Sequence, residues 1–267
     1  MEVGDWVNLQ SLIPNLQTTT EVTPMLNYLE TTPRTWLTAL WALWAILLFG
    51  GFIFGSAGES HRMPTWTRLA SSATLVAAGW SWFLVAPADD VKSYALFIAL
   101  GMTLGFLGDL ILAGALPGGR NVMGGIISFG IGHIFYIVGI LRFANQTGLD
   151  DPARRWGALA MWLVIAAVAW YLVVFRGQEA TVLHWAALPY ALLLASTTGF
   201  ATGLALQSSL FVGLAVGAAL FLFSDLVLAG ELFSGLKFRL IGDLIWLTYG
   251  PGQMLIVYSI GAALRFI

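Results

Sequence analysis

Long apolar segments without charged residues alternate along the chain with short polar ones. Eight of the apolar segments come close to the roughly 20 residues that an α-helix needs to cross a bilayer. They cover residues 36–56, 66–86, 94–116, 122–144, 156–175, 182–206, 208–230 and 240–266. Transmembrane β-strands are about 10 residues long and alternate in polarity, whereas 156–175 is apolar on every side. The pattern therefore predicts an all-α membrane protein with eight transmembrane helices.

The composition agrees with a membrane protein and excludes several kinds of chemistry. The chain is 58% hydrophobic and 10% charged, where a soluble domain is about 25% charged. It has no cysteine, which excludes disulfides, thiol nucleophiles and Cys-ligated metals. Twelve Lys and Arg are offset by 14 Asp and Glu, and no nucleic-acid partner is expected.

The first 35 residues differ from the rest of the chain. They are polar and Thr-rich and lack the basic-then-apolar layout of a signal peptide. We therefore expect an N-terminal extension (1–35) followed by a transmembrane domain (36–267) in the cell membrane. An even number of spans would place both termini on one side. Lys and Arg divide six against six between the two sets of loops, so this bias predicts no orientation.

A short motif occurs twice in the chain. Residues 101–114 read GMTLGFLGDLILAG and residues 217–230 read GAALFLFSDLVLAG, with seven of 14 positions identical. Four spans separate their starts, so the third and seventh helices should run in the same direction. This predicts two four-helix halves in a parallel repeat. Similar composition could produce some identity between apolar helices, but it does not account for the shared aspartate.

The shared residues, Asp109 and Asp225, are the main candidates for chemistry. Each lies five or six residues from the end of its predicted helix, roughly 8–9 Å below the interface at about 1.5 Å per residue. A carboxylate at such depth costs about 2.5–3.5 kcal/mol on insertion scales, so it should face the bundle interior and have a task there. The alternative is that each aspartate only joins helices by hydrogen bonds.

Other polar residues lie at similar heights in the predicted helices. They are His133, Tyr136, Tyr190, Tyr249 and Gln253. The i, i+3 and i, i+4 spacings place His133 with Tyr136, and Tyr249 with Gln253, on common helix faces. Interhelical hydrogen bonding alone would also account for them. Asp243, near the start of the eighth helix, is interpreted as a helix cap.

Motifs for metal or cofactor chemistry are missing. His61, His133 and His184 lie in different segments without ligand spacing. The chain contains neither a phosphate-binding loop nor a G-x-S-x-G motif. We expect no metal and no cofactor.

At these positions the sequence resembles the lysoplasmalogenase (YhhN-like) family of membrane proteins. The matching segments are Leu-Gly-Asp at 107–109, Gly-His-Ile-Phe-Tyr at 132–136, Pro-Tyr at 189–190, Phe-Ser-Asp at 223–225, and Thr-Tyr at 248–249 followed by Gln253. The resemblance implies an eight-helix hydrolase that cleaves the vinyl ether bond of lysoplasmalogens, which are lysophospholipids within the bilayer. It implies Asp109 and Asp225 as essential carboxylates, with His133, Tyr136, Tyr190, Tyr249 and Gln253 in the pocket. Pro251 departs from the family pattern and is expected to bend the helix near Gln253.

Paired carboxylates suit this reaction. A vinyl ether yields to acid, because protonation of the carbon β to oxygen produces an oxocarbenium ion that water captures. One carboxyl can donate the proton while the other, ionised, stabilises the cation. Ser224 beside Asp225, where Gly108 precedes Asp109, suggests Asp225 as the ionised member. The headgroup candidates are the loop residues Arg120, Lys237 and Arg239.

Two other classes remain open. Tandem repeats, intramembrane carboxylates and helices interrupted by Gly and Pro are also typical of ion- or proton-coupled transporters. The aspartates lie nearer one face than the midplane, which argues against transport. The third class is a non-catalytic lipid-binding protein. Release of aldehyde from a vinyl-ether lipid would separate the hydrolase from both.

Overall fold

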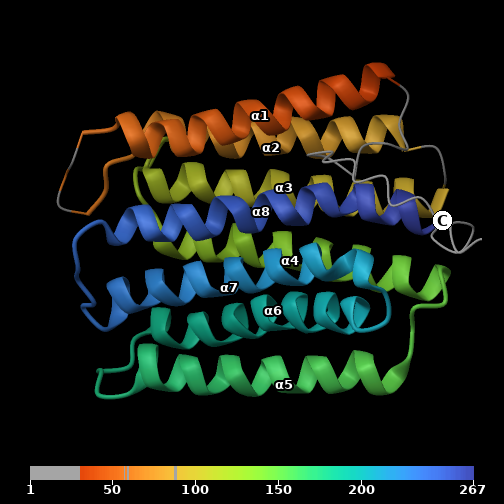
Figure 1. Ribbon diagram of the computed structural model, residues 1–267. Coiled ribbons are helices and arrows are strands. Elements are labelled where there is room, and N and C mark those ends of the chain that lie inside the picture. The colour runs from red at the N-terminus through yellow and green to blue at the C-terminus, as the bar shows by residue number, and fades with distance from the viewer. Residues whose placement is uncertain (1–30, 57, 59, 87–88) are drawn as a thin grey trace, which may run out of the picture.

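The structure is a computed structural model that describes residues 31–56, 58, 60–86 and 89–267. All regular secondary structure in this part of the chain is helical (Figure 1). The helices are α1 Thr31–Phe54, α2 Thr65–Val85, α3 Asp89–Ala113, α4 Val122–Gln146, α5 Pro152–Trp170, α6 Val182–Ala205, α7 Val212–Phe233 and α8 Ile241–Phe266. A π-helical turn, Tyr171–Phe175 (η3), extends α5, and a 3-10 turn, Ser209–Phe211 (η4), precedes α7.

Each of the eight predicted segments coincides with one helix. The largest shifts are five residues, at the starts of α1 and α3. Local sequence defines several helix ends: the Asn121 side chain accepts a hydrogen bond from the Gly124 N–H, and the Asp151 side chain accepts one from the Arg154 N–H. The predicted N-terminal extension lies outside the described residues except for its last five, which form the first turn of α1.

Among the described residues, six helices are long and apolar enough to cross a membrane. They are α1, α3, α4, α6, α5 together with η3, and α7 together with η4. Helices α2 and α8 do not meet the same standard of length and hydropathy, because they carry polar side chains that are buried inside the bundle. These are Thr67, Ser71, Ser72 and Thr74 on α2, and Asp243, Gln253 and Ser259 on α8. The two least apolar helices thus turn their polar residues inward.

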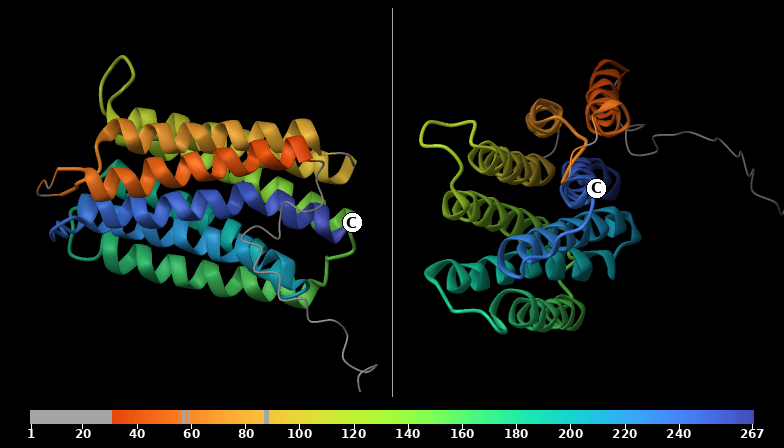
Figure 2. Two further views of the ribbon diagram at one scale, coloured as in Figure 1. Left: turned by 45° about the horizontal axis from the view of Figure 1, so that its top comes forward. Right: turned by 90° about the vertical axis from the view of Figure 1, so that its left-hand side faces the viewer.

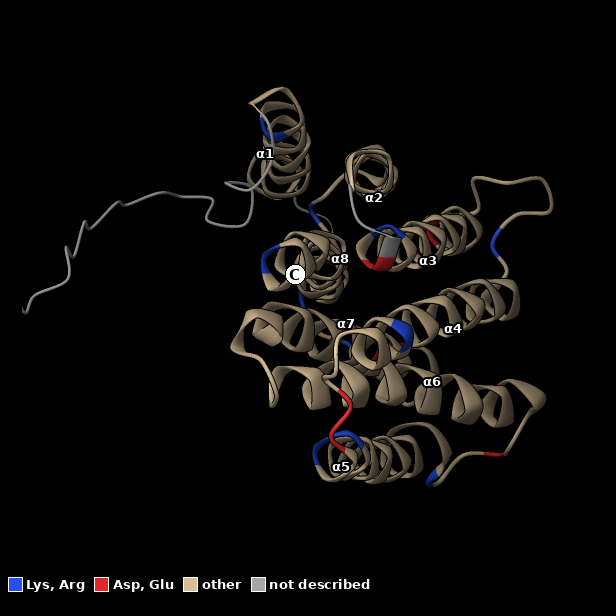
Figure 3. Cartoon of the chain, turned by 90° about the vertical axis from the view of Figure 1, so that its right-hand side faces the viewer, with Lys and Arg blue, Asp and Glu red and all other residues tan. Residues whose placement is uncertain are grey.

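The helices form an antiparallel bundle in which successive helices reverse direction (Figure 1). The turns after α1, α3, α5 and α7 therefore lie at one end, called here the loop end, and the C-terminus lies at the other. Helix α8 packs against α1, α2, α3 and α7 and is largely enclosed by them (Figure 2). Viewed along the bundle, the few charged residues lie mostly near helix ends and in turns (Figure 3).

Two pairs of glycines bring helices into close contact. A Cβ added to Gly101 of α3 would lie 2.9 Å from the Gly132 carbonyl oxygen of α4. A Cβ added to Gly217 of α7 would likewise lie 2.8 Å from the Gly252 carbonyl oxygen of α8. Small residues that let backbones approach are the usual means of packing helices in membranes. The α3–α4 and α7–α8 pairs are thus built alike.

Candidate functional site

Asp109 lies on α3 and is only 5% exposed. Its Oδ2 atom accepts hydrogen bonds from the Ser72 hydroxyl of α2 and from the Tyr249 hydroxyl of α8, the latter at 3.0 Å. Both donors come from helices that pack against α3. The cost of burying this carboxyl is therefore offset by two hydroxyl donors.

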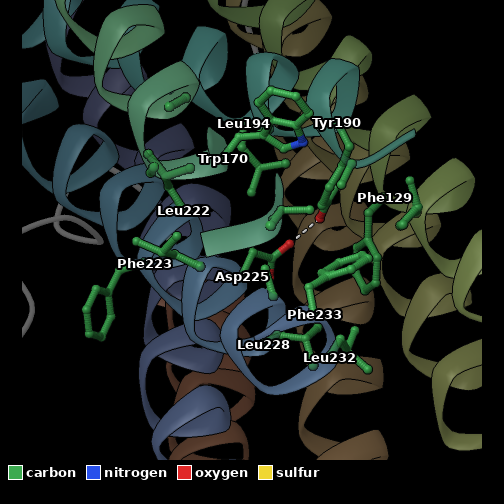
Figure 4. A pocket seen from close by; sticks show the side chains of 18 of the residues that line it. Phe129, Trp170, Tyr190, Leu194, Leu222, Phe223, Asp225, Leu228, Leu232 and Phe233 are labelled. Carbon is green, nitrogen blue, oxygen red and sulfur yellow. Dashed lines mark hydrogen bonds between the residues drawn. The ribbon is translucent and has the colours of Figure 1, made fainter. Parts of the chain in front are cut away.

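Asp225 lies on α7 and is less fully buried than Asp109. Its Oδ2 atom accepts a hydrogen bond from the Tyr190 hydroxyl of α6, drawn as a dashed line in Figure 4. The neighbouring Ser224 hydroxyl is 3.3 Å from Oδ1 but also donates to the Phe221 carbonyl oxygen at 2.7 Å. Tyr190 is therefore the principal hydrogen-bond donor to Asp225.

Both aspartates line one polar cavity at the loop end of the bundle. Its volume is about 340 Å³. The polar residues around it are Ser60, His61, Thr65, Arg68, Asp109, Arg120, Asp225, Glu231, Trp246 and Tyr249. The aspartates are close enough to interact electrostatically. One molecule in this cavity could therefore reach both carboxyl groups.

A second cavity, also of about 340 Å³, is almost wholly apolar and lies among α4, α5, α6 and α7. Asp225 and Tyr190 are set among its leucine, phenylalanine and tryptophan side chains (Figure 4). Five residues line both cavities: Leu112, Arg120, Phe129, Asp225 and Leu228. Asp225 thus lies at the junction of a polar and an apolar space, whereas Asp109 lines the polar space alone.

A hydrogen-bond chain supports Tyr249 from behind. The Tyr136 hydroxyl donates to Gln253 Oε1 at 2.9 Å, and Gln253 Nε2 donates to the Tyr249 hydroxyl oxygen at 3.2 Å. Helix α8 continues through Pro251, and Gln253 is 1% exposed. Gln253 is therefore hydrogen-bonded to Tyr249 although Pro251 lies two residues before it. Neither Tyr136 nor Gln253 lines either of the two cavities described above, and the hydrogen-bond chain connects both to Tyr249.

His133 lies behind the cavities as well. Its Nδ1 atom is 2.9 Å from the Thr197 hydroxyl, and its ring packs edge-on against Phe221 at a centroid distance of 4.6 Å. It is buried and lines neither cavity. The structure thus separates His133 from the two aspartates. Within the described residues, no group of three His, Asp or Glu side chains could hold a metal ion.

The basic residues proposed for a headgroup do not lie together. Arg120 lines both cavities, whereas Lys237 and Arg239 are exposed in the α7–α8 turn and line neither. Arg68 of α2 lines the polar cavity, and sequence reasoning missed it along with Ser72. The available signal was the group of Thr and Ser positions in the predicted second helix, which set it apart from its neighbours.

The sequence suggested that Asp243 caps its own helix, but the structure gives its carboxylate other partners. Its carboxylate accepts hydrogen bonds from the backbone N–H groups of Arg62 and Met63, the latter at 3.0 Å. The Gly242 N–H donates to the Ser60 carbonyl oxygen at 2.8 Å. These bonds hold the turn between α1 and α2 against the start of α8. That turn supplies Ser60 and His61 to the polar cavity.

The helix ends near the aspartates also differ from expectation. Helix α3 ends four residues after Asp109, because Gly114 adopts φ +69° and stops the helix. Helix α7 continues for eight residues after Asp225, past the equivalent Gly230. The two aspartates therefore do not lie at equal distances from the ends of their helices, and this distance does not measure their depth. What the two aspartates share is the polar cavity that both line.

Comparison with protein families gives a match over most of the chain. The model of the YhhN family matches residues 65–260, which include both aspartates and every residue that bonds to them. No curated protein and no solved structure matches the chain. The family match covers well over half of the 267 residues. The chain therefore belongs to the YhhN family.

Proposed function

We propose that this protein is a membrane-embedded hydrolase that cleaves the vinyl ether bond of lysoplasmalogens into a fatty aldehyde and a glycerophospho-base. One observation carries the proposal: two buried carboxyl groups on different helices line a single cavity, and one of them also lines an adjoining apolar cavity. An amphiphile with a polar head, an acid-labile bond and an alkyl chain matches this order of a polar cavity, two carboxyl groups and an apolar cavity.

The order of atoms in the substrate assigns the two roles. The carbon that takes the proton lies on the alkyl side of the vinyl ether, and the carbon that becomes cationic lies on the headgroup side. Asp225 adjoins the apolar cavity, whereas Asp109 lines only the polar one. Asp225 is therefore the proton donor, and Asp109 is the carboxylate beside the cation.

Hydrogen bonding supports the same assignment. Asp109 accepts bonds from two hydroxyl groups. Asp225 has one close donor and a distant, shared one. Hydroxyl donors favour the charged form of a carboxyl group. This reverses the roles that Ser224 suggested, because its hydroxyl bonds more closely to a backbone carbonyl.

The proposed reaction balances in three steps. Asp225 gives its proton to the carbon β to the ether oxygen. Water then adds to the oxocarbenium carbon while Asp109 takes one water proton, which forms a hemiacetal. Collapse of the hemiacetal releases the aldehyde as Asp109 returns that proton to the departing glycerol oxygen, and the hemiacetal hydroxyl proton restores Asp225. The hydroxyls of Tyr190 and Tyr249 hold the two carboxyls in place throughout.

We further propose that all eight helices cross the membrane as two four-helix halves, with both termini on one side. Helices α2 and α8 are 21 and 26 residues long, and their polar side chains face the bundle. The two glycine pairs support the repeat. So do the packing of α2 on α8 and of α6 on α4, which a two-fold relation would exchange.

The test is aldehyde release from a lysoplasmalogen by purified protein in detergent. The wild-type chain should release aldehyde, and Asp109→Asn and Asp225→Asn should each lose about 100-fold or more, the usual scale of acid–base catalysis. Size-exclusion profiles matching wild type would show that the variants fold. Full activity in either variant would overturn the mechanism.

Failure of the wild-type chain to release aldehyde would leave the two competing classes. Proteoliposomes loaded with a pH-sensitive dye separate those, because a proton-coupled transporter changes the internal pH on substrate addition and a lipid-binding protein does not.

A further inference from the structure

Arg68 lines the polar cavity, where Asp243 and Asp109 attract its charge without forming an ion pair with it. Its guanidinium lies over the Trp246 ring at 5.6 Å, and Nη2 donates to the Thr65 hydroxyl at 3.0 Å. The buried Nε atom has no hydrogen-bond partner, and the guanidinium forms no ion pair with any residue that the structure describes. A guanidinium held on an aromatic face with free donors is a good anion site, because its fork matches the oxygens of a phosphate.

Glu231 lines the same cavity from the last turn of α7. Its carboxylate makes no hydrogen bond or ion pair within the described part of the chain. Arg68 and Glu231 therefore share a cavity without neutralising each other. Besides the two aspartates, the cavity wall carries the cations Arg68 and Arg120 and the anion Glu231. Arg68 and Glu231, unpaired and kept apart, make the cavity complementary to a ligand that carries both charges.

We propose that the polar cavity binds a zwitterionic phospho-amine headgroup, with Arg68 contacting the phosphate and Glu231 the ammonium. This inference rests on the proposed function for the orientation of the lipid, and it adds the residues that select the headgroup. The alternative source of the same chemistry is a free phospho-amine. The lipid is favoured because the cavity shares Leu112, Phe129 and Leu228 with the apolar cavity beside it.

The experiment measures binding to the purified full-length chain in detergent, using lipids that cannot react. Three saturated 1-O-alkyl lipids of one chain length are compared: alkylglycerophosphoethanolamine, alkylglycerophosphate and alkylglycerol. Wild type should bind them in that order of decreasing affinity. Free phosphoethanolamine, used as a competitor, should bind much more weakly than the lipid that carries it.

Each variant should affect one part of the headgroup. Arg68→Gln should weaken both phosphate lipids about tenfold, the effect of one charge-assisted hydrogen bond, and leave alkylglycerol binding unchanged. Glu231→Gln should remove the preference for the ethanolamine lipid over the bare phosphate. The matched controls are Arg239→Gln and Glu179→Gln, which change exposed charges in turns at the same end and should alter nothing.

Several results would overturn the inference: equal binding of the three lipids by wild type, unchanged phosphate-lipid binding in Arg68→Gln, or free phosphoethanolamine binding as tightly as the lipid. If Arg68→Gln also loses alkylglycerol, it is misfolded and Glu231→Gln decides the matter. The proposed function can fail separately. Headgroup-dependent binding without aldehyde release would contradict the proposed hydrolase activity and support the headgroup site. Aldehyde release without headgroup dependence would support the hydrolase activity and contradict the headgroup site.

Discussion

The surroundings of Asp109 and of Asp225 differ although the helices that carry them share a motif. Asp109 accepts hydrogen bonds from Ser72 and Tyr249 and faces only the polar cavity. Asp225 has Tyr190 as its close donor and faces the apolar cavity as well. Equivalent carboxyls are thereby given unequal environments, which is what a reaction with a separate proton donor and charged partner needs.

The glycine pairs show where the difference arises. Asp109 lies eight residues after Gly101, and Asp225 lies eight after Gly217. On the facing helices, Tyr249 lies three residues before Gly252, and Phe129 lies three before Gly132. In the proposed repeat, Phe129 is the counterpart of Tyr249, and it lines both cavities as Asp225 does. Phe129 has no hydroxyl, and Asp225 has one close donor where Asp109 has two.

The largest predicted difference between the Asp109 and Asp225 variants is how their activity responds to acid. Asp225→Asn and Asp109→Asn should each lose about 100-fold or more at neutral pH. As the pH falls, activity of Asp225→Asn should rise with the hydronium concentration until Asp109 itself takes up a proton, because hydronium can replace a missing proton donor. Activity of Asp109→Asn should stay low, because acid does not replace a negative charge. Initial rates of aldehyde release, corrected for protein-free micelles, test this, and equal recovery would refute the assigned roles.

The effects of replacing the two tyrosines should follow the closeness of the one donor that each substitution leaves behind. Tyr190→Phe removes the close donor that holds the Asp225 carboxyl in place and leaves the distant Ser224 hydroxyl alone. This loss of orientation should outweigh the weaker stabilisation of the charged form, so kcat/KM should fall about tenfold. Tyr249→Phe leaves Ser72 on Asp109, and the loss should be a few-fold. Ser72→Ala combined with Tyr249→Phe should then lose more than the two single changes together. A Tyr249→Phe effect larger than that of Tyr190→Phe would contradict the comparison.

Much of this arrangement could be predicted from the chain, and some of it could not. Gaps between charges located all eight helices, and the repeat singled out Asp109 and Asp225, because an intramembrane charge is costly wherever it occurs. The hydrogen-bond donors to the two aspartates were harder to predict. Ser72 reaches Asp109 only because α2 packs on α3, and no local pattern specifies that contact. Lys237 and Arg239 carry the right charge, but the α7–α8 turn leaves them exposed and outside both cavities.

Of the two aspartates, only Asp225 lines the apolar cavity. The size of this cavity should therefore govern which alkenyl chain lengths of the substrate the protein prefers. Ala169 of α5 lines it, and Ala169→Phe should shift the preference several-fold toward shorter alkenyl chains by filling part of the space. Ala167→Phe is the matched control, because Ala167 is exposed on the outer face of the same helix. Rates for substrates that differ only in chain length provide the measurement. An equal shift in both variants would show that the chain lies elsewhere.

The smallest expected effect comes from making the halves more alike. Phe129→Tyr would add a hydroxyl to the wall of the two cavities that Asp225 also lines. A further donor favours the charged form of Asp225, so the proton donor is depleted and kcat should fall about threefold, the scale of one modest hydrogen bond. Phe129→Leu, which alters packing without adding a donor, is the control. If Phe129→Tyr were as active as wild type while an infrared carboxyl band confirmed the new hydrogen bond, the unequal donors would not be what separates the two roles.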